Sequence, residues 1–439
     1  MDQPTSALED FSLLFCPISQ PHPRLPPSRH AADGTLEFTH PSSQQHLLVW
    51  KSRPKRVLVL KKLGEELSQE FLQVLQYLGD QQLLHVLIEH QELETLDRQG
   101  LLSSMPYIDT WTPADVDTLH SFVDFVVCLG GDGLVLHAAQ LFGPSMPPVI
   151  AFRLGSLGFL TPHAFQDMRS HLDNVINGAD ELSTCRVTSS VDDTPLMGVY
   201  FTLRMRLRCE VFRKGKALPG GCHHVLNEVV LSRGALPYLS KIEVYERDTL
   251  ITKVQADGLM LATPTGSTAY SVAAGGSMVH PNVPSILFTP ICPHSLSFRP
   301  IVLPDYAQLQ LRIAGDARSG ALATFDGKFT QELLPGDSVQ VRMSPYPVPT
   351  INCLDQTLDW FSSIERCFRW NDRIEQKQFP ASVSGSAPAS HGGGSGGGGD
   401  DGAMPSVNGM SSIEEQQMKN GAAAAAAAAA ASQKSIQAR

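Results

Sequence analysis

A cluster of glycines around one aspartate, Gly130-Gly131-Asp132-Gly133, is the pattern in this sequence best suited to chemistry. It follows the apolar run 125–129 and precedes an apolar stretch with helical spacing, which predicts a strand, a tight loop and a helix. Glycines allow a ligand to approach the backbone closely and allow positive φ angles. The free N–H groups of the following helix suit a phosphate. A carboxylate beside a phosphate is unfavourable unless it takes a proton or holds a cation, and this predicts a chemical role for Asp132.

A second stretch, residues 257–271, carries the groups that a nucleotide needs. A short apolar strand pattern over 259–262 runs into a loop that is rich in hydroxyl groups and glycine and contains one aromatic residue, Tyr270. The loop therefore offers donors, acceptors and a stacking face together. Taken alone, Gly-Gly-Asp-Gly is equally typical of an ordinary turn. The second stretch favours a nucleotide site over that simpler interpretation.

Composition limits the classes of function. The chain has 439 residues, of which 42% are hydrophobic and 18% charged, enough for two domains with their own cores. A net charge of −10 argues against a nucleic-acid partner. No apolar run of 18 residues occurs outside the alanine tract 422–431, so we expect no membrane-spanning helix. The first residues resemble neither a secretory signal nor a typical transit peptide, and we expect a cytoplasmic protein.

The eight cysteines are scattered and contain no Cys-x-x-Cys pair. Reduced, mostly structural thiols in an intracellular protein are the favoured interpretation. Cys222-His223-His224 is the one local pattern that suggests a metal, but no partner cluster accompanies it. We therefore predict no metal-ligating side chains.

The elements that position the glycine loop belong to a predicted α/β domain over residues 53–185. A flexible arm rich in Pro, Ser and His precedes it over 1–52, with one short strand at 45–50. Strands alternating with helices predict a parallel sheet covered on both faces. The glycine loop would lie at the carboxyl end of its strand, where such sheets bind ligands. The predicted elements are strands at 56–60, 85–88, 122–129 and 149–152 and a helix at 63–78, with a glycine-bearing turn at 154–160.

A period of two predicts a β-rich, sandwich-like domain over residues 186–350. The clearest example is 200–209, in which polar and apolar residues alternate. Further strands are predicted at 225–231, 241–245, 259–262, 301–302, 308–313, 321–325 and 338–343. Arg204, Arg206, Arg208 and Arg213 form a possible phosphate patch, but three of them share one strand face, so a solvated face is the better interpretation.

The last part of the chain divides into a helix and a tail. Residues 351–378 predict a C-terminal amphipathic helix, centred on 355–377, that returns to the α/β domain. Binding of a partner such as calmodulin is the alternative, and we do not favour it. Residues 379–439 are rich in Gly, Ser and Ala and predict a disordered tail. The expected fold class is an α/β domain, a β-rich domain and disordered tails.

With both loops in view, the chain resembles the NAD kinases, and among them the plant and algal chloroplast type. The likeness covers about residues 55–375. Several separate motifs in the family's order support it: Gly130–Gly133, 154–161, Asn227-Glu228, Asp257-Gly258, 263–270 and 289–300.

This resemblance implies transfer of the γ-phosphoryl of ATP, with Mg²⁺, to the 2′-hydroxyl of the NAD adenosine ribose. It implies that Asp132 is the catalytic base and that the chain forms a homo-oligomer; the chloroplast stroma becomes the alternative compartment. Leu134 departs from the family, in which many members have threonine. The positions expected to bind NAD or ATP are Gly130, Gly131, Gly133, Asn227, Glu228, Asp257, Thr265, Thr268, Ala269, Tyr270 and Ser271.

Two other functions stay open. Lipid kinases of the diacylglycerol or sphingosine kind share a Gly-Gly-Asp-Gly loop and a similar two-domain plan. Asn227-Glu228 and the 263–270 loop argue against them because these groups suit a dinucleotide. A non-catalytic NAD-binding sensor is the second alternative, and the intact Asp132 argues against it.

Overall fold

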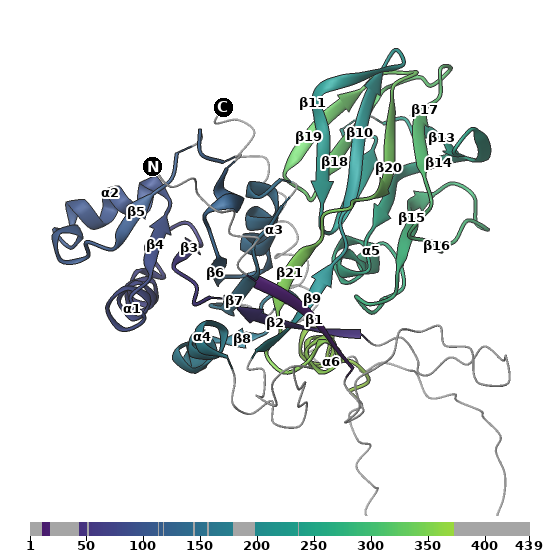
Figure 1. The fold of residues 1–439 in the computed structure, drawn as a ribbon. Coiled ribbons are helices and arrows are strands. Elements are labelled where there is room, and N and C mark those ends of the chain that lie inside the picture. Colours follow the sequence, from purple (N-terminus) through teal and green to yellow (C-terminus); the bar gives the residue numbers. More distant parts are fainter. Residues whose placement is uncertain are drawn as a thin grey trace, which may run out of the picture. The chain divides into compact units, whose positions relative to one another are not determined.

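The computed structural model describes residues 11–17, 44–50, 52–178 and 198–372, apart from positions 113, 117, 144, 156, 157 and 236. Two sheets organise this part of the chain, one of ten strands and one of eleven (Figure 1). The predicted tail 379–439 and most of the predicted arm lie outside the described residues. The expected fold class, an α/β domain followed by a β-rich domain, is confirmed.

A parallel core forms one end of the first sheet. Its strands run in the order β7-β6-β3-β4-β5 and pair in parallel, as the sequence predicts. All six residues of the central strand β6 are buried, which explains its continuous apolar sequence. The bounds of these strands are β3 Arg56–Lys61, β4 His85–Ile88, β5 Ile108–Thr110, β6 Phe125–Gly130 and β7 Val149–Arg153, with the short β8 His163–Ala164 beside β7.

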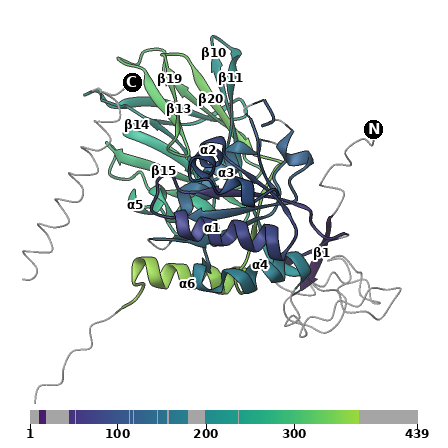
Figure 2. The same cartoon turned by 90° about the vertical axis from the view of Figure 1, so that its left-hand side faces the viewer.

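Helices cover both faces of this core. Helices α1 (Ser68–Gln76) and α4 (Met168–Asn177) share one hydrophobic cluster with β3 and β6, and Figure 2 shows both helices together. Helix α3 (Asp132–Leu141) packs on the opposite face through a second cluster. The helix predicted at 63–78 begins only at Ser68, and a π turn over Tyr77–Gln81 follows it. Helix α2 (His90–Arg98) was not predicted because Leu96 is its only buried side chain. Short 3₁₀ turns occur at Leu102–Ser104, Leu119–Ser121 and Phe165–Asp167.

Strands from distant parts of the chain extend the first sheet beyond its parallel core. They run in the order β1-β2-β9-β21 and end beside β7. β2 confirms the strand predicted at 45–50, whereas β1 was not predicted. β9 and β21 come from the stretch 186–350 and from its C-terminal end. The sequence periodicity assigned this stretch to the second domain, but both strands belong to the first sheet. The bounds are β1 Phe11–Pro17, β2 Gln44–Trp50, β9 Val199–Arg204 and β21 Val348–Ile351.

The strand predicted at 200–209 is in fact two strands in two sheets. β9 ends at Arg204, and β10 (Leu207–Arg213) begins the second sheet. Between them Arg206 is fully buried, so a solvated face is wrong for this arginine. Its guanidinium donates to four carbonyl oxygens: Tyr346 (2.7 Å), Ala139 (3.1 Å), Phe142 (3.2 Å) and Gly143 (2.8 Å). The last carbonyls of a helix lack partners within the helix. Arg206 supplies donors to the end of helix α3 and so links it to the segment that crosses between the sheets.

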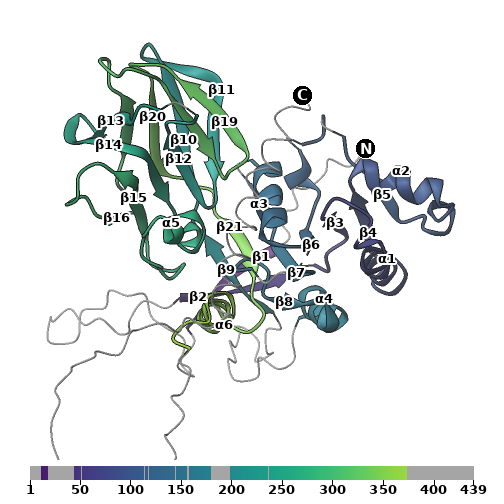
Figure 3. The ribbon, with the colours of Figure 1, turned by 180° about the vertical axis from the view of Figure 1, so that it is seen from behind.

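The second sheet is antiparallel and curls on itself. Its strands run in the order β11-β10-β20-β17-β13-β14-β12-β18-β19, and β15 joins β14 to β16. The ring of His223 on β11 stacks 4.2 Å from that of Phe325 on β18, although these strands lie far apart in the sheet order. Figure 3 shows the sheet from behind. The bounds are β11 Lys216–Val225, β12 Glu228–Ser232, β13 Ser240–Glu246, β14 Thr249–Ala262, β15 Ser285–Pro293, β16 Ile301–Pro304, β17 Leu309–Ile313, β18 Ala321–Phe325, β19 Phe329–Leu333 and β20 Ser338–Met343.

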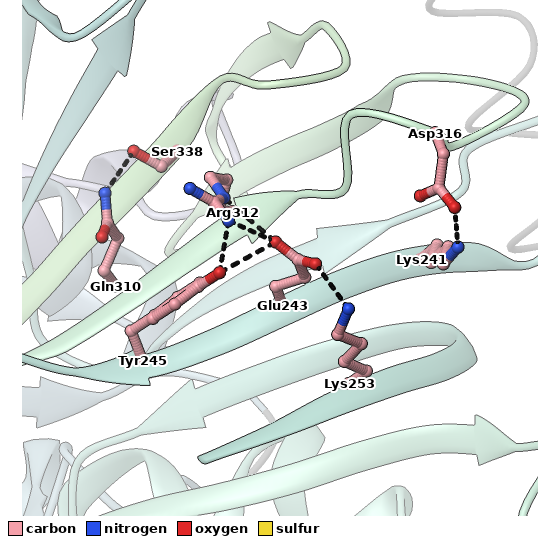
Figure 4. Close-up of polar contacts among 8 residues, drawn as sticks. All are labelled: Lys241, Glu243, Tyr245, Lys253, Gln310, Arg312, Asp316 and Ser338. Carbon is pink, nitrogen blue, oxygen red and sulfur yellow. Dashed lines mark hydrogen bonds and ion pairs between the residues drawn. The ribbon is translucent and has the colours of Figure 1, made fainter. Parts of the chain in front are cut away.

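A polar network lies across three strands of this sheet (Figure 4). Glu243 on β13 accepts from Arg312 on β17 at 2.6 Å and pairs with Lys253 on β14 at 3.0 Å. Tyr245 donates to the same carboxylate at 3.0 Å and also contacts Arg312. The hydrogen bonds from Arg312 and then Lys253 lower the pKa of Glu243 to about 2. The network therefore links neighbouring strands through one ionised carboxylate.

Helix α6 (Gln356–Phe368) closes the described chain and is shorter than the predicted 355–377. Asp355 caps it by accepting from the N–H groups of Thr357 and Leu358, both at 2.8 Å. The helix ends because Arg369 adopts a left-handed conformation, with φ of 48°. The ring of Phe368 lies 5.6 Å from that of Phe159. In the described part of the chain, no helix is long and apolar enough to cross a membrane.

Candidate active site

The β6–α3 junction confirms the predicted strand, tight loop and helix. β6 ends at Gly130, Gly131 caps the helix, and Asp132 is the first helical residue. The loop does not use the positive φ angles that glycine allows, because Gly131 has φ of −110° and neither Gly130 nor Gly133 adopts a positive value. The backbone is instead open: a Cβ atom at Gly131 or Gly133 would meet no atom within 4 Å. Glycine here leaves the helix N-terminus accessible to a ligand.

Three donors from one loop hold the Asp132 carboxylate. The N–H groups of Phe159 and Leu160 donate at 2.7 and 3.0 Å, and the Thr161 hydroxyl donates at 3.3 Å. A Cβ atom at Gly158 would lie 1.9 Å from Oδ1 of Asp132. The glycine-bearing turn seen in the sequence therefore serves the aspartate directly, which sequence reasoning did not show.

A cleft of about 830 Å³ is lined in part by Gly131 and Gly133 of the glycine loop. It lies at the carboxyl ends of β3 and β6, where parallel sheets bind ligands. Lys62 lines it, as does Lys61, which pairs with Glu92 at 2.9 Å. Lys328 reaches it from the second sheet and contacts His137 at 3.0 Å. Open helix N–H groups together with lysines make this cleft suitable for a polyanion.

Asn227 and Glu228 lie at the start of β12, above a buried carboxylate. Asp326 accepts from the N–H groups of Leu226 and Asn227, both at 2.8 Å, and of Glu228 at 3.2 Å. Burial raises the pKa of Asp326 to about 6, against the lowering effect of these three N–H groups. The side chain thus fixes the backbone of the Asn-Glu pair. Asp326 lies in the turn after β18, and no pattern in the sequence predicted this role for it.

Glu228 has an unused buried oxygen. Its side chain is 8% exposed, and its Oε2 atom has no hydrogen-bond partner among the described residues. Burial, and then the charge of Asp326, raise the pKa of Glu228 to about 7. An unpaired buried carboxylate oxygen is costly in a folded protein. Such an oxygen is typical of a site that a polar ligand completes.

The hydroxyl-rich loop packs directly against Asn227. The Thr263 hydroxyl donates to the Leu226 carbonyl at 2.5 Å, and the Thr263 N–H donates to the Asn227 carbonyl at 2.9 Å. A Cβ atom at Gly266 would lie 2.2 Å from the Asn227 oxygen, so only glycine fits. A 3₁₀ turn over Thr265–Thr268 and the short helix α5 (Tyr270–Ala273) follow. The structure therefore brings the two predicted motifs together.

The other predicted positions differ in exposure and in their hydrogen-bond partners. Burial raises the pKa of Tyr270, and the charges of Cys292, Asp257 and Glu228 add to the effect. Tyr270 is 46% exposed, and Asp257 accepts from Arg233 at 2.7 Å. Ser271, the next residue of α5, is instead fully buried, and its hydroxyl pairs with that of Thr289 at 3.1 Å. Thr268 and Ala269, at the end of the 3₁₀ turn, are partly buried.

Arg204 connects the two halves of the site. It donates to the Thr350 hydroxyl at 2.8 Å and to the Thr265 hydroxyl at 3.5 Å. Burial lowers its pKa to about 10, while the charges of Asp132 and Asp359 oppose that shift. Arg204 thus contacts the hydroxyl-rich loop and lines one pocket with Phe159 and Leu160, whose N–H groups hold Asp132. Sequence reasoning missed it because the alternating pattern predicted a solvated arginine face.

The two histidines of the local pattern Cys222-His223-His224 contact different groups. His223 stacks on Phe325, and His224 hydrogen-bonds the Ser344 hydroxyl at 2.8 Å. Cys222 is exposed.

The candidate site combines an open glycine loop at a helix N-terminus with an aspartate and an unpaired glutamate. This combination is typical of enzymes that act on nucleotides. The model of the ATP-NAD kinase N-terminal domain matches residues 56–180, and that of the C-terminal domain matches 226–353. An uncharacterised kinase of Schizosaccharomyces pombe is 35% identical over 350 residues, covering 74% of this chain and 82% of the relative. The chain belongs to the ATP-NAD kinase family.

Two further likenesses bear on this family. NAD kinase 2, chloroplastic, of Arabidopsis thaliana is 55% identical over 345 residues, which cover 79% of this chain and 33% of that protein. This chain thus matches about a third of that relative's length. The crystal structure of yeast NADH kinase complexed with NADH has a TM-score of 0.65 and 29% identity, covering 78% of this chain and 96% of that one. The expectation of a cytoplasmic protein is contradicted, because relatives at 55% and 56% identity are chloroplastic.

Proposed function

We propose that this chain transfers the γ-phosphoryl of ATP to the 2′-hydroxyl of the adenosine ribose of NAD and so produces NADP. The observation that carries the proposal is the position of Asp132. It begins helix α3 at the open glycine loop, and the N–H groups of Phe159 and Leu160 hold its carboxylate. Arg204 lines one pocket with Phe159 and Leu160 and donates to Thr265 of the hydroxyl-rich loop that packs on Asn227. Phosphoryl transfer to a hydroxyl requires that the phosphoryl donor and the acceptor hydroxyl both bind beside one carboxylate.

The acceptor would bind where the two sequence motifs meet. Glu228 offers an unpaired buried oxygen, and a ribose hydroxyl is a suitable donor to it. Tyr270 presents an exposed ring for packing against a base or ribose. The yeast relative was crystallised as a complex with NADH, so the oxidised and reduced dinucleotides are both candidate acceptors here. Family membership supports a dinucleotide over a lipid.

Asp132 would act as the base. A carboxylate has about four lone-pair sites, and the three donors from the 159–161 loop leave capacity for one more hydrogen bond. A ribose hydroxyl is a poor nucleophile, and a carboxylate within hydrogen-bond reach takes its proton as the bond to phosphorus forms. The other residues of the site would align the reacting oxygen with the phosphoryl group.

The lysine-lined cleft would hold the triphosphate of ATP. The N–H groups at the start of α3 and the side chains of Lys61 and Lys62 favour negative charge there. Mg²⁺ commonly binds through one or two carboxylates together with substrate phosphates. Glu89 lines the cleft and is 23% exposed, so it fits such an ion. When bound, Mg²⁺ would neutralise phosphate charge.

An endpoint assay tests the proposal. Purified chain is incubated with MgATP and either NAD⁺ or NADH, the reduced product is oxidised, and NADP⁺ is measured with an NADP-specific dehydrogenase. Asp132→Asn should lower turnover by about 10²-fold or more while NAD still binds, because the base is lost and the shape kept. Asp248→Asn, in the exposed β13–β14 turn, is the matched control.

Other results would favour the alternatives. Phosphorylation of diacylglycerol or sphingosine without NADP formation would indicate a lipid kinase. Calorimetric binding of NAD with no NADP from any donor would indicate a sensor. Near-normal turnover in Asp132→Asn would exclude the base assignment. Homo-oligomerisation stays a prediction, which light scattering of the purified chain tests.

A further inference from the structure

We propose that His163, His171 and Cys353 form a binding site for a transition-metal ion of the zinc class. The three residues come from β8, from helix α4 and from the segment between β21 and α6. Their ligand atoms all lie within 4.8 Å of one another. Among the described residues, this is the one group of at least three histidine, cysteine or acidic side chains with metal-binding spacing.

The distances fit tetrahedral coordination. Zinc lies about 2.0–2.1 Å from histidine nitrogen and about 2.3 Å from cysteine sulfur, so two nitrogens of one site are about 3.3 Å apart. The Nδ1 atoms of His163 and His171 are 3.0 Å apart. A small outward movement of one ring would therefore admit the ion. Imidazole and thiolate are also the ligand types that zinc prefers over magnesium.

The hydrogen bonds around His163 already orient it as a ligand. Its other ring nitrogen, Nε2, lies 3.1 Å from the Ile351 carbonyl oxygen. A carbonyl only accepts, so Nε2 carries the proton and Nδ1 presents a lone pair toward His171. Metal-binding histidines usually donate their second N–H to a carbonyl or carboxylate in this way.

The site has room for an ion and a fourth ligand. A cavity of about 90 Å³ is lined by all three residues together with Asn174, Tyr200 and Asn352. On binding, the His171 proton that now lies between the rings would move to its Nε2 atom. The Cys353 thiol would release its proton to solvent as the sulfur–metal bond forms. A water molecule would complete the tetrahedron.

Such an ion would bind together the elements that support Asp132. His163 follows Thr161, whose hydroxyl donates to Asp132, by two residues. The Cys353 N–H donates to Asp359 of helix α6 at 2.8 Å. An ion at this position would therefore join the aspartate-binding loop to the start of α6 and would reduce their relative movement.

The test is metal binding to the whole purified chain after removal of bound metal with a chelator. Calorimetry with Zn²⁺ should show one site per chain, and Mg²⁺ should not compete. Co²⁺ should give visible bands of a tetrahedral ion and a sulfur-to-cobalt charge-transfer band. Loss of even an indirect partner weakens metal binding about 10–100-fold, so Cys353→Ser and His171→Asn should each lose about 100-fold or more.

Matched variants keep the test decisive. Cys222→Ser and His85→Asn change exposed residues elsewhere and should bind Zn²⁺ as the parent does. His163 is fully enclosed and its replacement risks misfolding, so the partly exposed His171 is changed instead, with circular dichroism to confirm the fold. The absence of stoichiometric Zn²⁺ binding would overturn the proposal. So would a charge-transfer band that survives in Cys353→Ser.

Discussion

The backbone of Gly158 lies against the carboxylate of Asp132 so closely that a methyl group on Gly158 would lie 1.9 Å from Oδ1. No real Cβ contact is this short. The N–H groups of Phe159 and Leu160 reach the carboxylate only because the chain passes at this distance. The orientation of the proposed base thus depends on a residue 26 positions away in sequence.

Replacing Gly158 should therefore disable the site more than it harms the fold. Gly158→Ala must displace the Asp132 side chain or the 159–161 loop, and misplacement by about 1 Å can cost about 10²-fold in rate. We expect NADP formation to fall by about that factor. Gly315→Ala is the control, because its Cβ atom would enter open space at an exposed position. Equal activity of both variants would show that the contact does not matter.

Arg206 should be among the residues most important for stability. Its guanidinium is fully buried and is bound to four carbonyl oxygens. Arg206→Met would leave those acceptors unpaired, and we expect a loss of about 3–5 kcal/mol in the free energy of unfolding. Urea denaturation followed by tryptophan fluorescence measures it. Arg208→Met, at a partly exposed neighbouring position, should cost about 1 kcal/mol or less; a similar loss in both variants would contradict the argument.

Glu228 should make stability depend on pH. Its pKa is raised by burial to about 7 in the folded chain, so between about pH 4.5 and 7 the folded state holds a proton that the unfolded state has lost. Stability then falls as pH rises through this range. Glu228→Gln removes the dependence, and the variant should gain about 2 kcal/mol relative to the parent from pH 5 to pH 8. Urea titrations at both values measure this, with Glu332→Gln at the exposed surface as control. A constant difference would contradict it.

The Glu243 network should show the opposite dependence. Hydrogen bonds from Arg312 and Lys253 lower the Glu243 pKa to about 2, so its contribution is present above about pH 4.5 and is lost as pH falls toward 2. Arg312 and Lys253 are about half exposed, which limits the effect. We expect Glu243→Gln to cost about 1 kcal/mol at pH 7 and less at lower pH. Thermal denaturation across pH and salt measures it, and a cost that grows on acidification would refute the assignment.

The local sequence pattern was sufficient to predict those elements whose structure depends on residues adjacent in sequence. Buried parallel strands are continuous apolar runs, so β3, β4, β6 and β7 could be located without coordinates. The family motifs likewise predicted a role in the candidate site for Asp132 and the Asn227-Glu228 pair. These features were available because each depends on a few adjacent residues and on general rules of periodicity.

Tertiary structure decided what depends on residues far apart in the chain. An alternating pattern predicts a strand but not its sheet, so it could not show that 200–209 divides between two sheets at Arg206. Nor could it show that Arg204 and Asp326 lie at the candidate site, because their partners lie many positions away. His163, His171 and Cys353 meet for the same reason. Sequence by itself determined the chemistry that the chain carries, and long-range packing decided which groups reach one another.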